Sequence, residues 1–230
     1  MTRDDEPPTR PRTALLLGAT GLVGGHCLEL LLEDERYERV RALVRRPLAV
    51  RHRRLDSQVV DFDRLAEHPE LLAVDDVFCC LGTTMAQAGS ESAFRHVDYD
   101  YPVQVAEISS GQGADQFLMV SALGADPQSR IFYSRVKGEA EAVIKRLPFR
   151  AVWILRPSLL LGDRAELRIG ERLASALSRP LTPLMVGSLR RYRPVAARDV
   201  ALAMVHLARQ QSTGGMVESD EIPALARAGD

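Results

Sequence analysis

The segment Gly18-Ala19-Thr20-Gly21-Leu22-Val23-Gly24 constrains the fold of this chain more than any other. It follows an apolar run over 14–17 and precedes residues 27–33, which repeat at helical spacing. This order predicts a strand, a tight turn and the N-terminus of a helix. Gly18 would permit the turn, Gly21 the approach of a ligand to the backbone, and Gly24 close packing of the helix on the strand.

The start of that helix is suited to an anion. Its first backbone N–H groups have no partner within the helix, and the positive end of the helix dipole lies beside them. We therefore predict that this corner binds the pyrophosphate of a dinucleotide. The residues expected to contact it are Gly18, Thr20, Gly21, Leu22, Val23 and Gly24. A glycine-rich loop without a ligand is the alternative interpretation.

The composition excludes several classes of protein. The chain has 230 residues, of which 46% are hydrophobic, and its net charge is −1. Without a basic excess we expect neither a nucleic-acid partner nor binding to a membrane surface, and no apolar run is long enough to cross a bilayer. We predict a disordered leader over 1–12 and a single domain over 13–230.

The cysteines and histidines show no metal-binding pattern. Cys27, Cys79 and Cys80 have neither disulfide nor metal-ligand spacing, and the five histidines are scattered. We therefore expect no metal site, and we interpret the cysteines as buried free thiols in a reducing compartment. A cytoplasmic location is expected on this ground.

Strand and helix patterns alternate along most of the chain. Strands are predicted over 13–17, 39–44, 59–60, 76–81, 116–120 and 150–155, and helices over 22–33, 62–72, 90–110 and 129–145. Strands that are apolar on both faces and are separated by helices indicate a parallel sheet covered on both sides. With right-handed crossovers this predicts an α/β fold with a doubly wound parallel sheet and a ligand at the carboxyl ends of its strands.

The pattern loosens after Arg156-Pro157. Prolines break up the segment, and only two further helices are expected, over 171–177 and 198–208. We interpret 157–195 as a small C-terminal lid on the substrate side of the sheet, since it is too short to form a domain of its own.

The end of the second predicted strand distinguishes the two nicotinamide cofactors. NAD-selective sites place an acidic residue there, whereas this chain has Arg45 and Arg46. Two guanidinium groups suit a 2′-phosphate, so we predict NADP in preference to NAD. A solvated basic turn is the alternative. Asp61, after the third strand, is placed either to meet the adenine edge or to cap the following helix.

A second group of residues carries chemistry. Tyr133 and Lys137 are four apart on a predicted helix and therefore share a face, and Ser121 follows the fifth strand. An ammonium group favours the phenolate form of a tyrosine, which can then exchange a proton with a carbonyl or alcohol oxygen. The serine hydroxyl could hold that oxygen, and the lysine could also bind the nicotinamide ribose. Taken alone, such a Tyr–Lys pair is commonly structural.

Together these features resemble the short-chain dehydrogenase/reductase superfamily in its atypical branch, and more closely the Tat-interacting-protein oxidoreductases and their bacterial relatives. The resemblance rests on the segments 80–84, 97–101, 121–126, 133–139 and 156–164 in addition to the glycine turn. It implies a Rossmann-like NADP-binding fold in which Ser121, Tyr133 and Lys137 form the catalytic group.

The resemblance also implies further cofactor contacts. Leu81, Gly82 and Thr83 would pass along the cofactor, and Pro157 and Ser158 would face the nicotinamide. One residue departs from the family pattern, because Asp98 stands where many members carry an asparagine that supports a proton relay.

We therefore expect an NADP-dependent oxidoreductase acting on a small carbonyl or hydroxyl compound. One alternative is an NADP-binding regulator that engages a protein partner with little or no turnover. The other is a sugar-nucleotide epimerase, against which the short segment after residue 157 counts, since it must enclose a large ligand.

Overall fold

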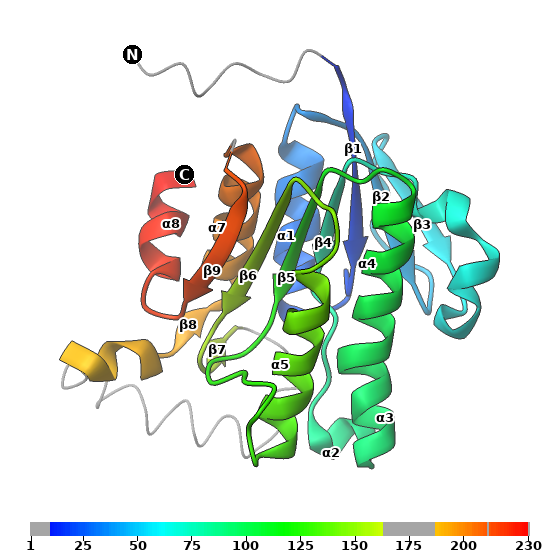
Figure 1. Ribbon diagram of the computed structural model, residues 1–230. Coiled ribbons are helices and arrows are strands. Elements are labelled where there is room, and N and C mark those ends of the chain that lie inside the picture. Colours follow the sequence, from blue (N-terminus) through cyan, green and yellow to red (C-terminus); the bar gives the residue numbers. More distant parts are fainter. Residues whose placement is uncertain (1–9, 163–186, 211, 230) are drawn as a thin grey trace.

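Seven strands form one parallel sheet in the computed structural model, which describes residues 10–162, 187–210 and 212–229 (Figure 1). The strand order is β3-β2-β1-β4-β5-β6-β9, and every neighbouring pair is parallel. The strands are β1 (Arg12–Leu17), β2 (Tyr37–Val44), β3 (Leu55–Val59), β4 (Asp76–Cys79), β5 (Gln116–Val120), β6 (Ala151–Arg156) and β9 (Gly214–Glu218). The predicted doubly wound α/β fold is confirmed.

Helices cover both faces of the sheet. In Figure 1, α4 and α5 lie in front of it, while α1 and α7 lie behind it. One layer consists of α1 (Leu22–Glu33), α7 (Ala197–Arg209) and α8 (Ile222–Gly229), and the other of α4 (Tyr101–Gly111) and α5 (Phe132–Ile144).

Alternation along β1 explains the two layers. Ala14 and Leu16 belong to the core under α1 and α7, whereas Leu15 and Leu17 belong to the core under α4 and α5. All four side chains are fully buried, as expected for a central strand whose side chains point alternately to opposite faces.

Two predicted helices differ in the structure. The helix expected over 62–72 consists of two 3₁₀ turns, η2 (Phe62–Glu67) and η3 (Pro69–Leu72). Pro69 explains the break, because proline lacks an N–H donor and disfavours helical backbone at the preceding residue. The helix expected over 90–110 is α3 (Glu91–Arg95), a π-helical turn η4 (His96–Asp100) and then α4.

Other differences lie at the margins. The third strand is Leu55–Val59 and not 59–60, because it is a half-exposed edge strand with few apolar residues. β9 and α8 were not predicted, since β9 begins with two glycines. The short elements are α2 (Met85–Ala88), η6 (Gly187–Tyr192) and a two-stranded ribbon of β7 (Leu160–Leu161) and β8 (Val195–Ala196).

The predicted leader and lid are only partly described. The helix expected over 171–177 and residues 1–9 lie outside the described residues. The leader prediction is wrong at its end, because β1 begins at Arg12. The Arg12 guanidinium lies 2.6 Å from Asp76 Oδ1 and 2.9 Å from Asp115 Oδ2, and these ion pairs attach the start of β1 to its neighbours.

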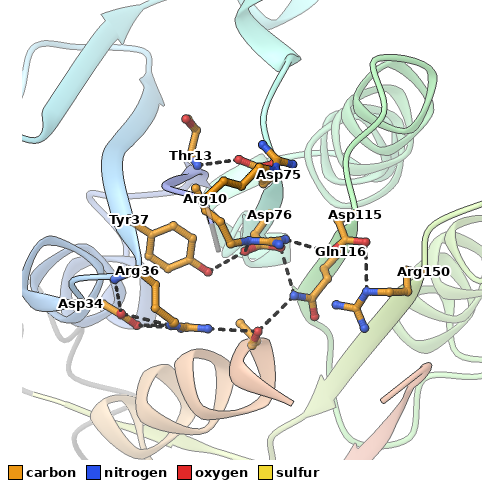
Figure 2. A network of polar contacts seen from close by, with 12 residues as sticks. Arg10, Thr13, Asp34, Arg36, Tyr37, Asp75, Asp76, Asp115, Gln116 and Arg150 are labelled. Carbon is orange, nitrogen blue, oxygen red and sulfur yellow. Dashed lines mark hydrogen bonds and ion pairs between the residues drawn. The ribbon is translucent and has the colours of Figure 1, made fainter. Parts of the chain in front are cut away.

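These ion pairs belong to a polar network at the amino ends of the strands, opposite the glycine turn (Figure 2). At its centre is Asp76, which is fully buried. It accepts hydrogen bonds from Arg12, from the Tyr37 hydroxyl at 2.8 Å and from the Gln116 amide at 3.1 Å. The network thus joins β1, β2, β4 and β5 at the edge of the sheet opposite the glycine turn.

Candidate functional site

The glycine turn lies between the carboxyl ends of β1 and β4. Gly18 has a φ of +78°, and a Cβ on it would lie 2.4 Å from the carbonyl oxygen of Cys80. A Cβ on Gly24 would lie 2.0 Å from the carbonyl oxygen of Gly18. The predicted tight turn at Gly18 and close packing at Gly24 are therefore confirmed.

Gly21 has a role within the turn that its sequence context did not show. Its N–H donates to the Gly18 carbonyl at 2.7 Å, and a Cβ on Gly21 would lie 2.8 Å from that same oxygen. The missing side chain is thus required by the turn itself, whether or not a ligand approaches.

The N-terminus of α1 is open to an anion. Gly21 caps the helix without a side-chain hydrogen bond, and the first turn contains no acidic residue. The N–H groups of Leu22, Val23 and Gly24 therefore face no carboxylate of their own helix, which suits a phosphate group. Thr20 is exposed beside them.

Arg45 and Arg46 are both exposed in the loop after β2, at the same edge of the sheet as the glycine turn. Neither forms an ion pair with another residue in the described ranges, so both guanidinium groups are available to a ligand.

Asp61 caps η2 by accepting a hydrogen bond from the Asp63 N–H at 3.0 Å. Of the two roles considered for Asp61, the cap is therefore observed.

The turn after β4 covers a buried ion pair. The Lys137 ammonium lies 2.7 Å from Asp98 Oδ1, and the N–H of Thr83 donates to Asp98 Oδ2 at 2.9 Å. A Cβ on Gly82 would lie 3.5 Å from Asp98 Oδ1 and 3.6 Å from Lys137 Nζ. Leu81, which completes this turn, is partly buried.

Tyr133 is one helical turn before Lys137 on α5. Its ring is partly buried and packs against Phe94, with the ring centroids 5.3 Å apart. Burial lowers the pKa of Lys137, but the negative charges of the Asp98 carboxylate and of an ionised Tyr133 raise it more, so the pKa lies above its ordinary value. The structure thus brings Tyr133 and Lys137 within electrostatic reach of each other.

Ser121 contacts α5 further along the helix than Tyr133. Its buried hydroxyl donates to Glu141 Oε1 at 2.5 Å, and Glu141 is held by two hydrogen bonds from Arg156. Glu141 is eight residues after Tyr133, which corresponds to about 12 Å along a helix axis. The sequence analysis did not single out Glu141, although the spacing of Tyr133, Lys137 and Glu141 at intervals of four could have indicated the shared face. Arg156 was noted only as part of the segment after the sixth strand.

Ser158 and Pro157 follow β6 and are engaged within the protein. Pro157 is buried, and its carbonyl accepts from the Leu123 N–H at 3.0 Å. The Ser158 hydroxyl donates to the Arg193 carbonyl, and the Ser158 N–H donates to the Ser219 hydroxyl at 3.0 Å. Ser158 therefore ties the segment after β6 to η6, and its hydroxyl is already in use.

Comparison with known proteins identifies the family. Residues 18–210 match the family model described as NAD(P)H-binding, beginning at the glycine turn. The chain belongs to this family. Protein HTATIP2 of Rattus norvegicus is 38% identical to it over 167 residues, covering 71% of this chain and 69% of that protein. The predicted resemblance to atypical short-chain dehydrogenases/reductases is confirmed.

Fungal relatives of this NAD(P)H-binding family correct one prediction. Protein FMP52, mitochondrial, of Debaryomyces hansenii is 32% identical over 210 residues, covering 88% of this chain and 90% of that protein. The same protein of Saccharomyces cerevisiae is 33% identical over 205 residues, covering 86% and 88%. Because these relatives are named mitochondrial, the expectation of a cytoplasmic location is wrong: cysteine spacing does not identify a compartment.

Solved structures share the fold. MoeE5 in complex with UDP-glucose and NAD has a TM-score of 0.67 and 18% identity, covering 94% of this chain and 81% of that one. UDP-glucuronic acid 4-epimerase from Bacillus cereus in complex with NAD has a TM-score of 0.66 and 15% identity, covering 91% and 78%. At these identities the likeness extends to the NAD(P)H-binding fold alone.

The cysteines agree with the prediction of free thiols. Cys27 and Cys79 are buried and Cys80 is partly buried, each without a disulfide. Burial raises the pKa of the Cys79 thiol to about 12, so this residue stays protonated and inert.

Within the described residues, no group of His, Cys, Asp and Glu is arranged to hold a metal, and no helix has the length and apolar character needed to span a bilayer.

A histidine at the start of η4 has an altered pKa. His96 Nδ1 lies 3.0 Å from Asp100 and Nε2 lies 2.6 Å from Asp63. These two contacts raise the pKa of His96 above its ordinary value of 6.5. A raised folded-state pKa means that the contacts stabilise the fold fully below the unfolded-state pKa, and that this contribution is lost as the pH rises through the folded-state pKa.

We expect Asp63→Asn to lower the pKa of His96, because the variant removes one of the two carboxylates. NMR titration of the imidazole signals measures this directly. Glu67→Gln is the control, since Glu67 is on the same 3₁₀ turn but pairs with Arg64. A His96 pKa that is the same in all three proteins would contradict the assignment.

Proposed function

We propose that this protein is an NADP-dependent oxidoreductase that transfers hydride to or from a small carbonyl or alcohol compound. The observation that carries the proposal is the Tyr133–Lys137 pair, one turn apart on α5 with Lys137 beneath the turn after β4, in a chain of the NAD(P)H-binding family. A phenol next to a buried ammonium is the acid–base group that such a reaction needs.

The residues present fit the cofactor. Side chains at Gly18, Gly21 and Gly24 would collide with the backbone of the turn, and the first turn of α1 has neither a side-chain cap nor an acidic residue. The N–H groups of Leu22 and Val23 would hold the pyrophosphate, as would that of Gly24. When bound, the nicotinamide supplies or accepts the hydride.

Other cofactor contacts proposed here line the same edge. Thr20 would lie beside the pyrophosphate, and the turn after β4 and the loop after β6 follow the two strands that flank β5. The proposed residues in these segments are Leu81, Gly82, Thr83, Pro157 and Ser158. Ser158 would contribute through its carbonyl oxygen, because its hydroxyl already donates to the Arg193 carbonyl and its N–H to the Ser219 hydroxyl.

In the proposed reaction Tyr133 gives a proton to a carbonyl oxygen, or takes one from an alcohol. The Lys137 ammonium favours the phenolate by its charge and is placed to bind the nicotinamide ribose. The Tyr133 hydroxyl has no hydrogen-bond partner within the described ranges, so it is available to a substrate oxygen.

Ser121 has a more limited role than the sequence indicated. Its proton is donated to Glu141, which leaves the oxygen lone pairs as acceptors. An alcohol substrate has a single O–H, which the proposed reaction gives to Tyr133, so it cannot also be donated to Ser121. We propose that the Ser121 hydroxyl donates to the substrate oxygen once it has released Glu141.

Turnover tests this function against its alternatives. The full chain is incubated with NADPH and a series of small aldehydes and ketones, and loss of the reduced cofactor is followed. Oxidation of NADPH with at least one carbonyl supports the proposal. NADPH binding with no turnover points to the regulator, and interconversion of UDP-sugars with NAD points to the epimerase.

Replacing Arg45 and Arg46 by alanine is expected to weaken NADP binding and leave NAD binding unchanged. A hydrogen bond to a charged group contributes about 1.5–3 kcal/mol, so loss of a single contact should lower NADP affinity by roughly 10- to 100-fold. Calorimetric titration with each cofactor measures this. Arg51→Ala, an exposed arginine further along the loop, is the control. Tighter binding of NAD than NADP by the unmodified protein would overturn the cofactor assignment.

A further inference from the structure

Lys137 is held in a place where a charge is costly. Its side chain is 6% exposed and that of Asp98 is 0% exposed, so both are removed from water. A buried ammonium without a counter-charge loses its proton readily, because burial disfavours the charged form. Asp98 therefore affects the protonation state of Lys137 as well as its packing.

The local backbone directs Asp98 inward. Asp98 is the middle residue of the π-helical turn η4, which joins α3 to α4, and the flanking residues Val97 and Tyr99 are less buried than it is. π-Helical turns are rare and occur frequently at functional sites. The wider turn brings the Asp98 carboxylate to α5 and to the turn after β4.

The Asp98 carboxylate has two partners. Thr83 holds Oδ2 through a backbone hydrogen bond, which fixes the carboxylate against the turn that we propose to line the cofactor. Oδ1 lies 2.7 Å from Lys137 Nζ, so the same carboxylate forms an ion pair with the ammonium. The position of Lys137 is thus coupled to the turn after β4.

Among the residues that the structure describes, three ionisable groups face the ammonium. They are Asp98 on η4, Tyr133 on the same helix and Cys79 at the end of β4. Cys79 stays a neutral thiol and Tyr133 carries no charge in its phenol form, so Asp98 is the group that supplies a full negative charge. Without Asp98, the burial of Lys137 would lower its pKa with little to counteract the effect.

We propose that Asp98 is a positioning residue that keeps Lys137 in its charged form and directs the ammonium beneath the turn after β4. The consequence for turnover depends on the proposed function, since it is the Lys137 charge that favours the Tyr133 phenolate. The effect on Lys137 itself does not depend on any reaction.

The composition of the chain makes a direct test practical. It contains two lysines, Lys137 and Lys145, among its 30 basic residues. NMR of the full chain with isotope-labelled lysine therefore gives two side-chain signals, and Lys145→Arg assigns them. We expect Asp98→Asn to lower the pKa of Lys137. A pKa of Lys137 that stays at its native value would overturn the proposal.

Asp100→Asn is the matched control. Asp100 is on the same π-helical turn but is exposed and faces His96, so its replacement should leave the pKa of Lys137 unchanged. If Asp98→Asn does not fold, the double variant Asp98→Asn/Lys137→Met shows whether the unpaired lysine is the cause. Recovery of cooperative unfolding shows that the unpaired lysine was the cause and supports the proposal, whereas continued failure to fold shows a structural role for Asp98 alone and overturns it.

Activity then separates this proposal from the proposed function. In an active enzyme, Asp98→Asn should move the alkaline decline of kcat to lower pH, as Lys137 loses its proton earlier. A lowered Lys137 pKa in a protein without turnover would leave the assignment of Asp98 intact and count against the oxidoreductase alone.

Discussion

Replacing Tyr133 by phenylalanine is expected to lower kcat for carbonyl reduction by about 10²- to 10⁴-fold, the usual contribution of a general acid. The variant keeps the aromatic ring against Phe94 and removes only the hydroxyl that would give the proton. The affinity for NADPH should change little, because the proposed contacts to the pyrophosphate and to the 2′-phosphate lie on α1 and after β2, and Lys137 is unchanged. Steady-state turnover and a calorimetric titration together measure both quantities.

Tyr99→Phe is the control for this variant. Tyr99 is on the neighbouring turn η4, and its ring lies 4.1 Å from the Arg95 guanidinium, a contact that survives loss of the hydroxyl. Tyr99→Phe should therefore keep nearly full turnover. If Tyr133→Phe also kept full turnover while binding NADPH normally, Tyr133 would not be the acid–base group.

The second large effect is on stability. Asp76→Ala is expected to lower the free energy of unfolding by about 3–5 kcal/mol, the usual cost of removing one partner of a buried ion pair. The variant leaves the Tyr37 hydroxyl without its acceptor, removes one of the two acceptors of the Gln116 amide and removes the main counter-charge of Arg12 (Figure 2). Urea denaturation followed by circular dichroism measures the change.

Glu67→Ala provides the comparison for Asp76→Ala. Glu67 forms an ion pair with Arg64 in which both side chains are more than half exposed, and such pairs contribute little in water. We expect almost no change in its unfolding midpoint. A loss in Asp76→Ala as small as that in Glu67→Ala would show that the network is not what joins the amino ends of the strands.

The sequence predicted those parts of the fold that depend on local pattern. The alternation of apolar strands with helices is strong enough to place β1, β2, β4, β5 and β6, and the glycine turn marks the site edge. β9 could not be found in this way, because its glycines carry no apolar signal and it is defined by pairing with β6. Gly214 has a φ of +98°, and a Cβ on it would lie 2.2 Å from the Val152 carbonyl oxygen, so its role is visible only across the sheet.

In the candidate site, too, local spacing could be predicted from the sequence and contacts made by tertiary packing could not. The i, i+4 spacing of Tyr133 and Lys137 follows from helix geometry and could be read in the sequence. The partners of Lys137 and Ser121 could not, because Asp98 and Glu141 reach them through tertiary packing across 39 and 20 positions of the chain. Asp98 was noted as a departure from the family pattern, but its direction depends on a π-helical turn that no periodicity indicates.

A crystal structure of the full chain grown with NADPH tests the central claim most directly, since it shows both ends of the cofactor at once. The account predicts the pyrophosphate on the backbone N–H groups at the start of α1 and the nicotinamide beside the Tyr133 hydroxyl. A dinucleotide bound elsewhere, or a nicotinamide ring remote from Tyr133, would contradict it.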